Sequence, residues 1–115
     1  MNRPTTERRA EPRYDLRLPM HYRISQRGVP VISGSGLTLD ISVHGISFRC
    51  RKPLPVGVHI EVSIDWPARY SEQYPIELQA TGFVMRSDHG RTAMRMTSHK
   101  LRVAPAPMEQ VRVSA

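Results

Sequence analysis

The chain has 115 residues, about the size of one domain, and 39% of them are hydrophobic. It contains no apolar run near the ~18 residues of a membrane-spanning helix, no signal-peptide pattern in residues 1–9 and a single cysteine, Cys50, so we expect a cytoplasmic protein without membrane insertion. Seventeen basic and ten acidic residues give a net charge of +7, which favours an anionic partner without indicating its kind.

Alternation of apolar and polar residues predicts strands along most of the chain. Residues 1–7 are polar and are expected to form a tail, and Pro12 blocks a helix in the basic loop that follows. The clearest strand pattern begins at Leu16, where every second residue up to Ile24 is apolar. The expected strands span residues 16–25, 37–42, 46–50, 58–65, 76–86 and 92–97.

The segments between these strands carry turn-forming residues. Glycine and serine make residues 33–36 a flexible link, and Trp66-Pro67 ends the fourth strand before a polar loop. Gly82 predicts a bulge in the fifth strand, and residues 87–90 predict a hairpin turn before the last strand.

About six strands with no helix between them predict an all-β domain, either an antiparallel barrel or a compact sandwich. Cys50 alternates with Ile46 and Phe48, so we expect it to face the core. The prolines of the C-terminal segment exclude a long helix there, and a short helical turn is compatible with residues 98–103.

The expected strand pair around Gly45 carries the first candidate site. Period-2 alternation places Leu37, Leu39 and Ile41 on one face and the polar residues between them on the other. Asp40 and Ser42 then project together beside the turn, where a carboxylate and a hydroxyl can read the edge of a planar polar ligand. The alternative is that both residues only shape the turn. Gly45 would supply backbone freedom or allow close approach of a ligand.

The basic N-terminal loop carries the second candidate site. Three residues separate Arg9 from Arg13, and Arg8 precedes them. A guanidinium group can bind a phosphate or the N7/O6 edge of guanine through two hydrogen bonds. Alternatively, these arginines form only a solvated basic tail.

The sequence offers no support for catalysis or metal binding. The five histidines are scattered, and no pair has the spacing of a known zinc site. Ser42 and His44 do not form a nucleophile motif, and the glycines of residues 34–36 precede a strand, unlike those of a phosphate-binding loop. We therefore expect no catalytic residues, no metal and no enzymatic activity.

Taken together, the two candidate sites resemble the paired signature of the PilZ family. That signature is RxxxR followed by (D/N)xSxxG, and it is matched by Arg9-x-x-x-Arg13 and Asp40-x-Ser42-x-x-Gly45. The flanking residues are also similar to the family, and the resemblance extends over roughly residues 7–98. The C-terminal helix common in the family is not evident after Ser98.

The resemblance implies a six-stranded antiparallel β-barrel over residues 8–98, with an arginine loop at residues 8–15. Residues 1–7 and 99–115 would be tails. It also implies that the chain binds cyclic di-GMP, a bacterial second messenger, without a further cofactor. The ligand-binding residues would be Arg8, Arg9, Arg13, Asp40, Ser42 and Gly45.

This resemblance indicates a non-catalytic receptor that changes conformation on binding the ligand and signals to a protein effector. We expect a monomer or weak dimer that binds no nucleic acid. Two alternatives stay open: a PilZ-like barrel that binds no ligand and acts as a protein-interaction module, and a small basic barrel that binds RNA or single-stranded DNA. The latter predicts aromatic residues spread over a sheet face, whereas aromatics make up only 6% of the chain.

Overall fold

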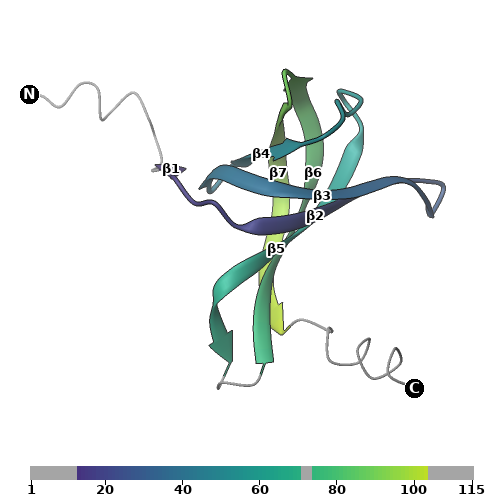
Figure 1. The fold of residues 1–115 in the computed structure, drawn as a ribbon. Coiled ribbons are helices and arrows are strands. Elements are labelled where there is room, and N and C mark those ends of the chain that lie inside the picture. Colours follow the sequence, from purple (N-terminus) through teal and green to yellow (C-terminus); the bar gives the residue numbers. More distant parts are fainter. Residues whose placement is uncertain (1–12, 71–73, 104–115) are drawn as a thin grey trace, which may run out of the picture.

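A computed structural model of the chain describes residues 13–70 and 74–103 (Figure 1). The described residues form seven strands and no helix, so they include no helix able to cross a membrane. The strands are β1 (Arg13–Tyr14), β2 (Pro19–Gln26), β3 (Val29–Ser42), β4 (Gly45–Cys50), β5 (His59–Tyr70), β6 (Tyr74–Asp88) and β7 (Arg91–Val103).

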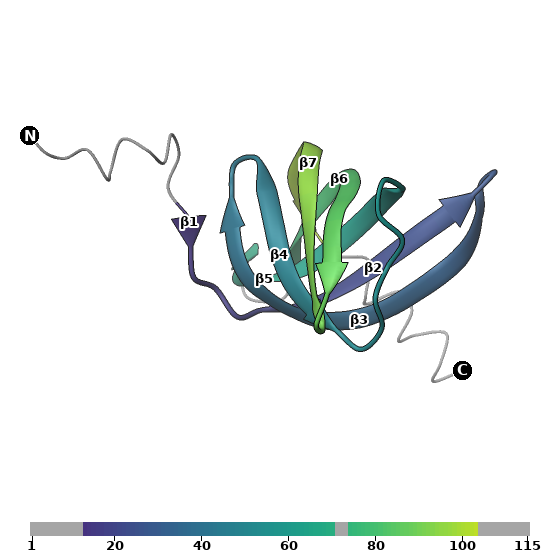
Figure 2. The same cartoon turned by 90° about the horizontal axis from the view of Figure 1, so that it is seen from above.

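Six of the strands close into a ring. The order β3-β2-β5-β6-β7-β4 returns to β3 because β4 pairs with both β7 and β3, and every pairing is antiparallel. Figure 2 shows the strands surrounding a common interior. The short strand β1 adds to β3 outside this ring. The predicted all-β fold is confirmed, and its six antiparallel strands form a closed ring.

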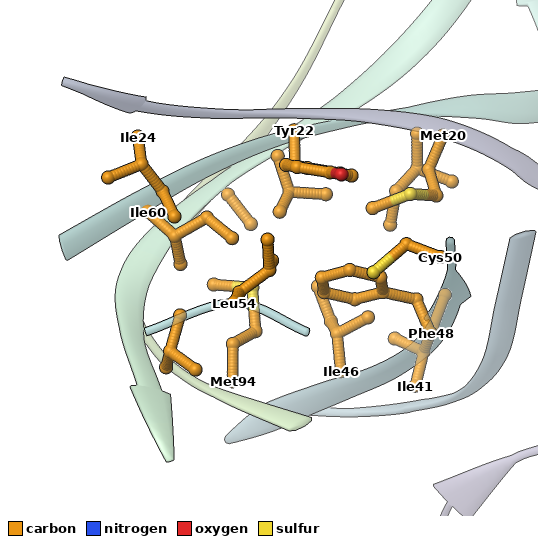
Figure 3. Packing of buried hydrophobic residues seen from close by; sticks show 14 of the residues in the cluster. Met20, Tyr22, Ile24, Ile41, Ile46, Phe48, Cys50, Leu54, Ile60 and Met94 are labelled. Atoms are coloured by element: carbon orange, nitrogen blue, oxygen red, sulfur yellow. The ribbon is translucent and has the colours of Figure 1, made fainter. Parts of the chain in front are cut away.

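The interior of the ring is filled by apolar side chains that alternate along the strands (Figure 3). Met20, Tyr22 and Ile24 of β2 are buried, as the period-2 pattern predicts. The rings of Tyr22 and Phe48 stack with their centroids 5.8 Å apart. Cys50 is buried in the same cluster, as expected. Full burial of each large apolar side chain contributes about 1.5–3 kcal/mol, so this cluster is the main source of stability.

The alternation expected around Asp40 is interrupted by a bulge. Thr38 is fully buried, whereas Leu37 is 41% exposed, which reverses the predicted faces of these two residues. The register of β3 against β4 shifts between Thr38 and Asp40, and the extra residue, Leu39, accounts for the reversal. The buried Thr38 hydroxyl donates to the carbonyl of Leu16 and accepts the N–H of Leu18 at 2.8 Å, so its polar group is satisfied.

The flexible link predicted at residues 33–36 is wrong, because β3 runs through it without interruption. The backbone of β3 pairs with β2 from Val29 to Leu37, and pairing with β4 begins at Gly36. These hydrogen bonds to neighbouring strands override the weak strand preference of glycine and serine.

Strands β5 and β7 are longer than the sequence predicts. β5 passes Trp66-Pro67 through a register shift and pairs with β6 up to Tyr70, so the polar loop expected there is wrong. β7 pairs with β6 as far as Val103, which replaces the helical turn considered for residues 98–103. The bulge at Gly82 and the hairpin turn are confirmed, with positive φ at His89 and Gly90.

Candidate ligand-binding site

A pocket of about 190 Å³ lies where β1, β3, β4 and β7 meet. Arg13, Asp40, Ser42 and Gly45 all line it. The structure therefore brings together every predicted site residue that it describes. Arg8 and Arg9 lie outside the described residues.

Pairing of β1 with β3 places Arg13, the last residue of the first motif, next to the second motif. Arg13 is the backbone partner of Ser42. Its Nη1 lies 3.5 Å from Oδ1 of Asp40, and its side chain is 50% exposed. One short antiparallel pairing thus brings the ends of the two sequence motifs into contact.

The carboxylate of Asp40 lies between two guanidinium groups. Arg13 approaches Oδ1, and Nη2 of Arg91 lies 3.8 Å from Oδ2. Both separations exceed the 2.7–3.2 Å typical of a direct N–H···O hydrogen bond, so both oxygens keep the capacity to accept hydrogen bonds from a ligand. The side chain is 22% exposed, which leaves it accessible from the pocket.

Ser42 is less accessible than the sequence suggests. It is only 7% exposed, and its hydroxyl lies 3.5 Å from the carbonyl oxygen of Gly45, across the turn. This weak contact is compatible with the turn-shaping role and leaves the hydroxyl free to rotate toward a ligand in the pocket.

Gly45 is not itself a turn residue. The turn consists of Val43 and His44, and Gly45 begins β4 opposite Arg95 of β7. A Cβ atom at this position would lie 2.9 Å from the carbonyl oxygen of Met94. Close approach of the β7 backbone is therefore sufficient to require glycine here.

Strand β7 contributes two cationic residues that sequence reasoning missed. Arg91 pairs with Asp40, and Arg95 lines the pocket beside Gly45. Their spacing of four residues places them on the same face of a strand, which is the one sequence signal that could have linked them. The register between β4 and β7 brings Arg91 and Arg95 next to the motif that contains Asp40 and Gly45. The sequence alone does not reveal that register.

Comparisons with known proteins indicate the family of the chain. The model of the PilZ domain family matches residues 7–111. The fold is similar to that of the Bacillus subtilis inhibitor of motility (MotI/DgrA), with a TM-score of 0.58 and 15% sequence identity, over 89% of this chain and 46% of that one. The present chain thus spans about half the length of that neighbour. A search of curated proteins found no match. Because the family model matches nearly the whole length of the chain, the chain belongs to the PilZ domain family.

Proposed function

We propose that this chain is a non-catalytic receptor for cyclic di-GMP that signals to a protein effector. The observation that carries the proposal is the backbone pairing of Arg13 with Ser42. It brings Arg13, from the first half of the family signature, into one pocket with the second half. Membership of the PilZ family supports the same ligand class.

The pocket suits a guanine base that carries a phosphate. The Asp40 carboxylate can accept hydrogen bonds from the N–H groups of guanine, and the Ser42 hydroxyl can donate or accept at the same edge. The guanidinium of Arg13, half exposed beside Asp40, can bind a phosphate or the N7/O6 edge of a second guanine. In the free protein the Arg13–Asp40 pair keeps both groups at the pocket.

The described pocket is too small to enclose the whole ligand. Its volume of about 190 Å³ is below the roughly 300–1,000 Å³ of sites that bury a drug-sized molecule. We infer that Arg8 and Arg9 complete the site by folding over the bound ligand. Such a local rearrangement would change the surface that an effector meets, which is how binding would produce a signal.

Mapping the amide chemical shifts of the labelled protein during titration with cyclic di-GMP tests the location of the site. The proposal expects the largest shifts at Arg13, Asp40, Ser42 and Gly45, with further shifts in residues 8–12. GTP at the same concentration is the control for a general response to a guanine nucleotide. Shifts confined to another face, or equal shifts with GTP, would contradict the proposal.

A further inference from the structure

Strand β3 has a free edge at residues 29–35. One edge of this segment pairs with β2. On the other edge, β4 pairs with β3 only from Gly36 onward, so no strand of the described chain bonds residues 29–35 there. Figure 2 shows this part of the β2–β3 hairpin extending beyond the ring. An unpaired edge presents backbone N–H and C=O groups to any extended chain that reaches it.

The segment after β4 turns away from β3 and leaves a groove. Pro53 and Pro55 lack the N–H groups that would continue the pairing. Leu54 is buried, and its N–H donates to Oγ of Ser87 at 2.8 Å, which anchors this segment away from β3. Between the segment and the β3 edge lies a groove of about 690 Å³.

The walls of the groove combine apolar and cationic side chains. Val31 of β3 is 53% exposed on one wall, and Arg51 and Lys52 are exposed on the other. No acidic side chain is among the described residues that line the groove. The free edge therefore favours a ligand with an extended backbone, and the positive charge of Arg51 and Lys52 favours a ligand with acidic side chains.

We propose that this groove binds an extended acidic segment of a partner protein, which adds a strand to the free edge of β3. The partner's backbone would pair with residues 29–35, its apolar side chains would contact Val31, and its carboxylates would face Arg51 and Lys52. The proposal does not depend on cyclic di-GMP binding, because the groove shares no lining residue with the pocket at Asp40.

A fluorescent, acetylated peptide of alternating valine and glutamate is a suitable probe. Anisotropy with the full chain is expected to show saturable binding, which Lys52→Glu weakens at least about five-fold, because the substitution replaces a favourable charge with a repulsive one. Lys100→Glu makes the same change of charge on β7, away from the groove, and is expected to alter affinity less than about two-fold. Thermal melts of both variants establish that they remain folded. Equal weakening by the two variants would overturn the proposal.

A second probe separates strand pairing from general charge attraction. N-methylation of alternate residues removes backbone donors and leaves the carboxylates in place, so it is expected to abolish binding. Hydrogen exchange of the amides at residues 31–35 is expected to slow only with the unmethylated peptide. Binding that survives methylation would overturn the proposal. It would also be overturned if the free protein formed a dimer in which these amides were already protected from exchange, because a second copy of the chain would then occupy the groove.

Discussion

The guanidinium of Arg91 lies 3.8 Å from the carboxylate of Asp40, although the two residues are far apart in the sequence. The β6–β7 hairpin turn presents Arg91 at the start of β7, and β3 presents Asp40 from the opposite side of β4. Together with Arg13, Arg91 fixes the carboxylate at the pocket where the family signature converges. Arg91 is therefore part of the candidate site even though neither motif contains it.

Substitution Arg91→Ala is expected to weaken cyclic di-GMP binding by roughly three-fold. The effect is small because the substitution removes one exposed ion pair that orients the Asp40 carboxylate. The free energy of unfolding should change by less than about 1 kcal/mol, because the Arg91 side chain is half exposed. Titration calorimetry and urea denaturation measure the two quantities. Arg102→Ala, which removes the ion pair with Glu77 away from the pocket at Asp40, is the control and should leave affinity unchanged. Equal effects of both variants on affinity would show that Arg91 acts only through net charge.

Substitution Arg13→Ala is expected to have a larger effect on binding. Loss of a bidentate contact to guanine or phosphate costs on the order of 1–3 kcal/mol of binding free energy. The melting temperature of the free protein should hardly change, because the side chain is half exposed and its ion pair with Asp40 is long, at 3.5 Å. The same result is expected for Arg9→Ala. A large fall in melting temperature for Arg13→Ala would mean that this arginine stabilises the fold.

Substitution Gly82→Ala is expected to destabilise the ring by at least about 3 kcal/mol. A Cβ atom on Gly82 would lie 1.8 Å from the carbonyl oxygen of Arg95, and backbone atoms cannot move away as a flexible side chain can. Urea denaturation of Gly82→Ala and Gly28→Ala compares the two sites. A Cβ atom on Gly28 would meet nothing within 4 Å beyond its chain neighbours, so only the positive φ of 80° opposes alanine, at a cost of about 1 kcal/mol. Similar losses at both positions would contradict the register of β6 against β7.

The pH dependence of stability is expected to report on Tyr22. Burial in the core, with a smaller contribution from Cys50, raises the pKa of Tyr22 above its ordinary value of 10.0. As the pH rises through about 10, the unfolded chain releases this proton while the folded chain retains it, so the free energy of unfolding falls. Below that pH the group contributes no pH dependence.

Urea denaturation of the wild type and of Tyr22→Phe between about pH 8 and pH 11 isolates this effect. The difference between their free energies of unfolding should stay constant up to about pH 9.5 and then change in favour of the phenylalanine variant. A difference that stays constant to pH 11 would show that the phenol is not buried as described.

The sequence predicts the ring and its core because local patterns there agree with the tertiary pairing. Met20, Tyr22 and Ile24 alternate inward, and the turn at His89-Gly90 forms where glycine follows a polar residue. The same periodicity fails at Thr38, because this bulge is set by pairing with β4 and, unlike the bulge at Gly82, is not marked by a glycine. Residues 33–36 look like a linker for a similar reason: their strand conformation depends on pairing with β2 and, at Gly36, also with β4.

The candidate site could be predicted only in part. Asp40, Ser42 and Arg13 could be found because the family signature contains them, and the structure places them in one pocket. Arg91 and Arg95 could not be found, because their position beside Asp40 and Gly45 depends on the register of β7 against β4. The role of Gly45 also required the structure, since the atom it must accommodate belongs to Met94.

Calorimetric titration of the purified, folded chain with cyclic di-GMP tests the receptor proposal most directly, with GTP and a short single-stranded RNA as controls at physiological salt. The proposal predicts selective binding of cyclic di-GMP at micromolar or lower concentration, weakened by Arg13→Ala and unaffected by Arg102→Ala. The absence of heat with cyclic di-GMP would contradict it and leave a barrel that acts through protein contacts. Binding of the RNA instead would identify a nucleic-acid-binding barrel.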